Sequence, residues 1–184
     1  MSWTEIKNQL GELPADEVIK LVKGLHGLSP QNKAWLKSKL LPIAQDAEYL
    51  EACRRKVSNY VYKETTRIPP MPRFGEARKV IIEYRKFTDD LCGTLDLMLT
   101  YIERGHQFTL DFGDINEPFY LALENMWEHF AVELRRSPAK YEQYEQFKPR
   151  LLKMRRRSDI GWGYGDTVRG TVDELEKYLG KTGG

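Results

Sequence analysis

The sequence predicts an all-α fold, either a compact irregular helical bundle or a short array resembling a helical repeat, with about nine helices. Three observations support this prediction. Apolar residues recur at intervals of three to four along almost the whole chain. Proline and glycine signals divide this pattern into helix-sized segments, and no series of alternating apolar and polar residues predicts a sheet. No repeat of fixed period occurs, so bundle and array both stay open.

The composition is ordinary for a globular chain. Of 184 residues, 41% are hydrophobic and 30% are charged, which suits one domain or two small lobes that share a core. The net charge of +2 does not by itself indicate a nucleic-acid or membrane partner, so electrostatic arguments depend on local clusters. Cys53 and Cys92 lie in separate apolar segments and are expected to be buried, reduced thiols.

The first residues, MSWTEIKNQL, lack the basic and then apolar pattern of a signal peptide. No window approaches the ~18 consecutive apolar residues of a membrane span. We therefore expect a cytoplasmic protein without a membrane partner.

Residues 1–64 are predicted to form an N-terminal helical lobe of three short helices and one longer helix. Ser2 and Glu5 have the spacing of a capping box. Pro14 and Pro30 suit the first turns of the next two helices. The residues expected to face inward on the three short helices are Trp3, Ile6, Leu10, Val18, Leu21, Val22, Leu25, Trp35, Leu36 and Leu40.

Residues 65–73 are predicted to form an extended linker. Pro69, Pro70 and Pro72 exclude a helix and favour a polyproline-like backbone. The same prolines suggest a ligand for a polyproline-binding domain, but Arg73 stands where such a ligand needs its second proline. A linker is therefore the favoured interpretation.

Residues 74–180 are predicted to form a C-terminal helical lobe, and 181–184 a flexible tail; alternatively, both lobes form one continuous domain. One helix of this lobe is expected to end near Gly105, and another to break or kink near Pro149. The last helix is expected to begin near Thr167.

An acidic stretch after Gly105 is a candidate metal site. Asp111, Asp114 and Glu117 are spaced by three residues, and His106 lies nearby. Oxygen-rich loops of this kind hold hard cations, although the spacing differs from that of an EF-hand. The alternatives are a contact with a partner and a helix cap, in which Asp114 or Asn116 begins the next helix.

No complete catalytic pattern is present. The chain has no G-x-S-x-G motif and no cysteine in an electropositive setting. Glu103 and His106 have the Glu-x-x-His spacing of di-metal bundles, but no second copy completes such a site. The sequence therefore assigns no catalytic residue and no cofactor.

The segment KPRLLKMRRR, residues 148–157, is strongly basic and contains no acid. Three interpretations stay open: a solvated helix face, contacts with nucleic-acid phosphates, and contacts with an acidic protein. The candidate contact residues are Arg150, Lys153, Arg155, Arg156 and Arg157.

The segment GWGYGD, residues 161–166, is interpreted as a tight connection that docks the last helix. Asp166 is expected to be the N-cap of that helix. A phosphate-binding turn is disfavoured, because Asp166 occupies the place where the anion would lie. The alternative is a partner-binding surface formed by Trp162, Gly163, Tyr164 and Asp166.

Two motifs together resemble a family of bacterial proteins known only as a domain of unknown function. They are DINEPFY, with Glu117–Tyr120, and IGWGYGD, with Gly161–Asp166. The N-terminal stretch ELPADEVIKLVKGLHGLSPQNKAWLKSKL is similar to the opening of the same family. The resemblance covers most of the chain and implies a small, helical, intracellular bacterial protein. It implies no catalytic role.

Three functions follow as hypotheses. The favoured one is a non-enzymatic interaction module that binds a protein partner through an aromatic and basic surface. The second is a nucleic-acid-binding protein that uses residues 148–157. The third is a metal-assisted hydrolase that uses acids of the 106–117 and 161–166 loops.

Overall fold

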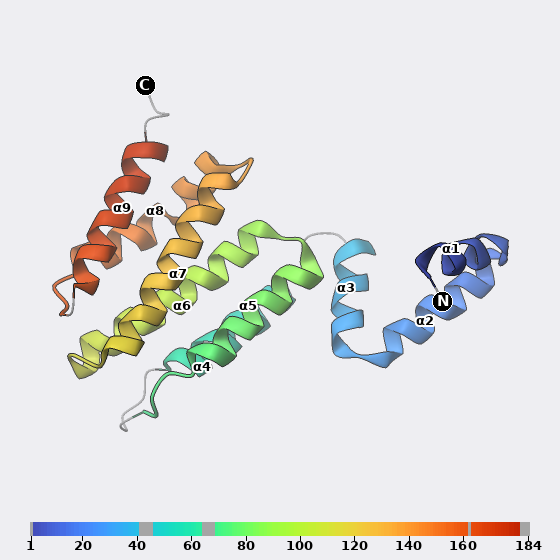
Figure 1. Cartoon of the computed structure of the whole chain (residues 1–184), viewed down its shortest axis with the longest axis horizontal. Coiled ribbons are helices and arrows are strands. Elements are labelled where there is room, and N and C mark those ends of the chain that lie inside the picture. Colours follow the sequence, from blue (N-terminus) through green and yellow to red (C-terminus); the bar gives the residue numbers. More distant parts are fainter. Residues whose placement is uncertain (1, 41–45, 64–68, 162, 181–184) are drawn as a thin grey trace. The chain divides into compact units, whose positions relative to one another are not determined.

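The computed structural model describes residues 2–40, 46–63, 69–161 and 163–180. Within these ranges the chain forms nine helices and no strand, which confirms the all-α prediction (Figure 1). The helices are α1 (Trp3–Glu12), α2 (Ala15–Leu28), α3 (Pro30–Leu40), α4 (Asp46–Val61), α5 (Phe74–Thr88), α6 (Leu91–Phe112), α7 (Glu117–Arg136), α8 (Lys140–Arg156) and α9 (Tyr164–Leu179).

The chain divides into two compact units, residues 1–49 and 50–184. The division falls within α4, upstream of the predicted linker. The described part of the proline segment, residues 69–73, is not helical and belongs to the second unit. The Arg73 N–H donates to the carbonyl oxygen of Tyr60 at 2.8 Å, so this segment is tied to the end of α4. Residues 65–68 lie outside the described ranges, and the linker role stays a prediction.

Side-chain hydrogen bonds cap the starts of two helices in the first unit. The predicted capping box of α1 is confirmed: the Glu5 N–H donates to Ser2 Oγ at 3.3 Å, and the Ser2 N–H donates to Glu5 Oε2 at 2.6 Å. Ser29 Oγ accepts from the Asn32 N–H at 3.1 Å at the start of α3. The Asn32 side chain also donates to the Leu25 carbonyl oxygen at 2.7 Å, which joins α3 to α2.

The predicted burial of the N-terminal apolar stripes is wrong for α1 and α2. Neither helix contains a buried side chain, and Leu21 and Leu25 are exposed. Trp35 and Leu40 of α3 are also exposed. The physical reason is size: three helices of 10, 14 and 11 residues enclose too little volume for a core.

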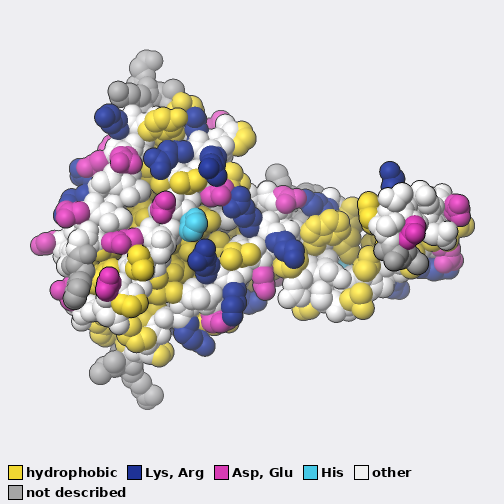
Figure 2. Space-filling view, in the orientation of Figure 1, with side chains coloured by type: hydrophobic (Ala, Val, Ile, Leu, Met, Phe, Trp, Pro, Cys, Tyr) yellow, Lys and Arg dark blue, Asp and Glu magenta, His cyan; other side chains and the backbone are white. Residues whose placement is uncertain are grey.

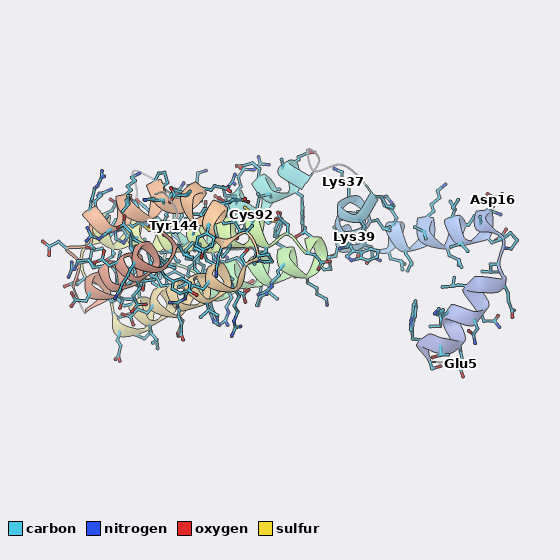
Figure 3. The ribbon with its side chains drawn as sticks, turned by 90° about the horizontal axis from the view of Figure 1, so that it is seen from above. Glu5, Asp16, Lys37, Lys39, Cys92 and Tyr144 are labelled. Atoms are coloured by element: carbon cyan, nitrogen blue, oxygen red, sulfur yellow. The ribbon has the colours of Figure 1, made fainter. Side chains whose placement is uncertain are left out.

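The core of the second unit surrounds α6. This helix contacts α5, α7 and α8, and α9 contacts α7 and α8. In Figure 1, α9, α7, α6 and α5 follow one another across the unit, as these contacts require. The largest fully buried side chains include Trp127, Phe130, Phe147, Tyr84, Tyr144 and Tyr164. Tyr144, labelled in Figure 3, lies among these helices.

Two helices are longer than predicted. Gly105 does not end α6, which continues to Phe112. A Cβ at Gly105 would collide with Leu123 of α7, so this glycine permits close helix packing instead of a turn. Helix α8 is likewise not broken at Pro149, whose position is exposed, and the kink expected there stays a prediction. Packing of α8 on its neighbours outweighs the hydrogen bond that proline cannot donate.

Both cysteines are free thiols, as expected, but the predicted burial is confirmed for Cys53 and wrong for Cys92. Cys53 is buried on α4, and Cys92 is half-buried near the start of α6. Burial and the neighbouring Asp90 and Asp96 raise the pKa of the Cys92 thiol, which favours its uncharged form. The Cys92 thiol is therefore poorly suited to act as a nucleophile at neutral pH.

Candidate functional site

A polar pocket of about 420 Å³ lies between α4, α6 and α8 in the second unit. Its lining combines five cationic and two acidic side chains with one histidine: Arg54, Arg104, Arg150, Lys153 and Arg157; Asp96 and Glu103; and His106. On α6, the lining residues Asp96, Thr100, Glu103 and Gln107 recur at intervals of three or four positions. On α8 and its C-terminal end, Arg150, Lys153 and Arg157 do the same. Each helix therefore turns one face toward the pocket.

An ion-pair network forms one wall of this pocket. The Arg150 guanidinium donates to both carboxylate oxygens of Glu103 at 2.9 and 2.6 Å, and to Asp96 Oδ1 at 2.7 Å. Arg54 donates to Asp96 Oδ2 at 2.9 Å. Burial alone would lower the pKa of Arg150, but its bonds to Glu103 and Asp96 raise it overall. The network ties α4, α6 and α8 together and uses both acids of the pocket.

His106 lines the same pocket and is only 3% exposed. Neither of its ring nitrogens has a hydrogen-bond partner among the described residues. Burial lowers its pKa to about 4, and the nearby Arg157 backbone opposes this shift without reaching hydrogen-bonding geometry. The ring is therefore neutral at pH 7, and a buried donor and acceptor without partners cost roughly 1–3 kcal/mol each.

Two cations of the pocket have no acidic partner among the described residues. Lys153 is exposed and makes no such ion pair, and Arg157 donates to Gln107 Oε1 at 3.2 Å. Because Asp96 and Glu103 are already bound to arginines, the mouth of the pocket is electropositive.

The predicted metal ligands do not form one site. Asp111 accepts from the Tyr62 hydroxyl at 2.7 Å and from the Gln107 amide at 2.6 Å. Asp114 accepts from the Tyr120 hydroxyl at 3.2 Å, and Glu117 is exposed in the first turn of α7. Among the described residues, no group of three or more His, Cys, Asp or Glu side chains is placed to hold a metal ion.

The helix cap at this loop is Asn116, one of the two expected alternatives. Asn116 Oδ1 accepts from the Phe119 N–H at 3.1 Å. Asp114 instead lies against Gly161, where a Cβ would collide with its carboxylate. The 113–116 loop and the turn before α9 are therefore neighbours, although they do not gather metal ligands.

The turn before α9 docks the helix tightly. Tyr164 is fully buried, and its hydroxyl accepts from Trp127 Nε1 at 3.2 Å. Its side chain therefore belongs to the core rather than to a partner-binding surface. Gly163 is exposed in the left-handed conformation, with φ of 74°, as the N-cap of α9. Trp162 lies outside the described residues.

The expected N-cap role of Asp166 is wrong. Helix α9 begins at Tyr164, three residues earlier than expected, and Asp166 lies in its first turn. There it pairs with Arg169 at 2.5 Å. Gly163 adopts the positive φ that ends the preceding turn, so the helix starts at Tyr164 and not at the position predicted from Asp166.

Internal contacts occupy part of the basic run of α8. Arg150 belongs to the ion-pair network, and Arg155 pairs with Asp173 of α9 at 2.5 Å. Lys153, Arg156 and Arg157 are exposed. Two of the five predicted contact residues are therefore engaged in ion pairs within the chain.

A second cavity lies within the first unit, between α2 and α3. It measures about 630 Å³ and is mostly apolar. Its lining residues are Ile19, Val22, Leu36 and Leu40, with Lys23, His26, Lys33 and Lys37. We call it the α2–α3 groove. Ile19 and Leu40 are 63% and 73% exposed, and Figure 2 shows hydrophobic side chains at the surface of this unit.

Neither cavity was predicted from the sequence. Of the residues that line the α2–α3 groove, Val22, Leu36 and Leu40 were expected to face inward. The α4–α6–α8 pocket is formed by residues about 50 positions apart, such as Glu103 and Arg150. A signal for it was present in Glu103 and His106, which do share the pocket, although Glu103 is bound by arginine instead of a metal.

None of the helices in the described ranges is both long enough and apolar enough to cross a membrane. A comparison of the chain with protein-family models, curated proteins and solved structures gives no match. The resemblance of DINEPFY and IGWGYGD to a bacterial family therefore stays a prediction.

Proposed function

We propose that this chain is a non-enzymatic interaction module and that its α2–α3 groove binds an acidic amphipathic helix of a protein partner. The observation that carries this proposal is the groove itself: an exposed apolar floor with three lysines and no acid among its lining residues. An apolar groove between two helices suits the apolar face of a third helix.

The positive charges around the α2–α3 groove favour an acidic partner helix. Lys23, Lys33 and Lys37 border the apolar floor. The carboxylate of Glu48 lies 3.9 Å from the Lys37 ammonium, at the limit of an ion pair, and Glu48 does not line the groove. A partner helix with Asp or Glu beside its apolar stripe would match this border, and a basic helix would be repelled.

This proposal changes the surface expected from the sequence. The predicted surface combined the 161–166 turn with the basic run of α8. Tyr164 is buried, and Arg150 and Arg155 are in ion pairs. The same pairing weakens the support for a nucleic-acid interface at 148–157, and the separate contacts of Asp111 and Asp114 weaken the support for a metal-assisted hydrolase.

Binding of designed helical peptides tests the proposal. The probe is a peptide with leucines at helical spacing and glutamates beside them, and its control carries lysines in place of the glutamates. We expect isothermal titration calorimetry to detect binding of the acidic peptide only, with an affinity that falls as salt is raised.

Two substitutions on one helix provide the matched comparison. Lys37 lines the groove and Lys39 does not, although both lie on α3 (Figure 3). We expect Lys37→Glu to weaken binding of the acidic peptide about five- to tenfold, because it replaces an attraction of about 0.5–0.7 kcal/mol with a repulsion of similar size. Lys39→Glu is expected to change the affinity less than twofold. Equal effects of both variants, or no peptide binding, would refute the proposal; binding of DNA or RNA in its place would favour the nucleic-acid alternative.

A further inference from the structure

We propose that the α4–α6–α8 pocket of the second unit binds a small molecule that carries a phosphate group, with Lys153 and Arg157 contacting the phosphate and His106 contacting a polar group of the same ligand. This inference does not depend on the peptide groove, because the two cavities lie in different units.

The charge of the pocket favours a dianion. Of the five cationic lining side chains, Lys153 and Arg157 have no acidic partner among the described residues, so they leave two positive charges for a ligand. The acids cannot neutralise the mouth, since Arg54 and Arg150 already hold both of them. A phosphate monoester carries nearly two negative charges at pH 7 and three acceptor oxygens. Lysine and arginine are the side chains that bind such groups most often.

His106 is the second and independent observation. Its side chain is 97% buried, it lines the pocket, and both of its ring nitrogens lack a partner among the described residues. Buried polar atoms are nearly always hydrogen-bonded. A neutral imidazole offers one donor and one acceptor, which fit a hydroxyl group or a protonated phosphate oxygen. The two ring nitrogens without hydrogen-bond partners therefore indicate a polar ligand.

The size of the pocket favours a small molecule over a nucleic acid. A volume of about 420 Å³ lies within the range of small-ligand sites. A nucleic-acid backbone requires a row of free cations, but Arg155, beside the pocket on α8, pairs with Asp173. A sugar phosphate has the charge, the hydroxyl groups and the size that the lining requires.

Calorimetry of the full chain at low ionic strength tests the proposal. The probes are glucose 6-phosphate, inorganic phosphate and uncharged glucose. We expect glucose 6-phosphate to bind, glucose not to bind, and inorganic phosphate to bind more weakly because it lacks the sugar hydroxyls. No binding of either phosphate, or equally tight binding of a single-stranded oligonucleotide that competes for the pocket, overturns the proposal.

Substitutions locate the site. The double variant Lys153→Gln with Arg157→Gln changes only exposed side chains and is expected to weaken glucose 6-phosphate at least tenfold. The matched control is Arg156→Gln, which removes a charge from the same helix outside the pocket lining and is expected to change affinity less than twofold. If the control weakens binding as much as Lys153→Gln or Arg157→Gln alone, the effect is general charge attraction and the pocket is not the site.

A pair of substitutions at His106 tests its contact with the ligand. His106→Leu removes both ring nitrogens, and His106→Gln keeps one donor and one acceptor group. We expect His106→Leu to lose the preference for glucose 6-phosphate over inorganic phosphate and His106→Gln to keep part of it. Circular dichroism identifies any variant that fails to fold, and an unchanged preference in a folded His106→Leu variant would contradict the assigned contact.

Discussion

At the scale of single residues, His106 combines a stability cost with a place in the pocket. Its neutral ring is buried and lines the same pocket as Arg104, Arg150 and Arg157, and the carboxylate of Glu103 is already bound by Arg150. Protonation would place an additional charge in this region without an unpaired acid to receive it. The ring is therefore better explained as a ligand contact than as a group that stabilises the fold.

This burial makes stability depend on pH. The pKa of His106 falls from 6.5 to about 4 on folding, so the unfolded chain binds more protons between these values and the free energy of unfolding decreases as pH falls. Urea denaturation at pH 7 and pH 5 is expected to show a loss of about 2 kcal/mol from this residue. In His106→Leu that part of the loss should disappear. An equal pH dependence in both proteins would contradict the assignment.

At the scale of helices, close approaches of the backbone decide the start of α9. Gly165 is buried, and a Cβ there would collide with the carbonyl oxygen of Ser158. Arg169 donates to the same carbonyl oxygen at 2.9 Å and to Ser158 Oγ at 3.1 Å. The close approach of Gly165 and the two hydrogen bonds from Arg169 both fix the turn before α9 at Ser158. This explains why the segment connects helices and keeps Tyr164 buried.

Two alanine substitutions in α9 test this packing. Gly165→Ala is expected to lower the free energy of unfolding by about 1–3 kcal/mol, because the backbone must move to admit the methyl group. Gly170 is exposed in the same helix and has no neighbouring atom that its Cβ would meet. Gly170→Ala is expected to raise the free energy of unfolding by about 0.5–1 kcal/mol through helix propensity. Chemical denaturation measures both changes, and similar values for the two variants would argue against the close approach.

At the scale of the whole molecule, the two units differ in how much apolar surface they bury. Helices α1 and α2 contain no buried side chain, whereas α6 has 13 buried residues among its 22. Short helices without a packed face are marginal in water, because most helical stability in proteins comes from tertiary packing. The first unit is therefore suited to bind a partner that covers its apolar surface.

Hydrogen exchange with mass spectrometry tests this difference. Amides of α1 and α2 are expected to exchange at least about a hundredfold faster than those of α6 and α7, since they open locally without disturbing the core of the second unit. Binding of the acidic peptide should slow exchange in α2 and α3. Equal protection in both units of the free chain would contradict the expected difference.

The sequence by itself determined the helical class and several local features. The three-to-four-residue apolar spacing predicted the helices, and Ser2 with Glu5 predicted a capping box that the structure contains. Asn116 was one of two predicted caps for α7. These features depend on residues close together in the chain, where hydrogen bonding and backbone geometry act locally.

Only the tertiary structure decided burial, helix ends and the candidate sites. The same amphipathic spacing is buried in α7 and exposed in α2, because it describes one face of a helix and not what covers that face. Gly105 continues α6 because Leu123 packs against it, and Glu103 meets Arg150 only after α6 and α8 dock. Contacts between residues distant in the chain leave no fixed spacing in the sequence, so the pocket around His106 becomes visible only once the helices are packed.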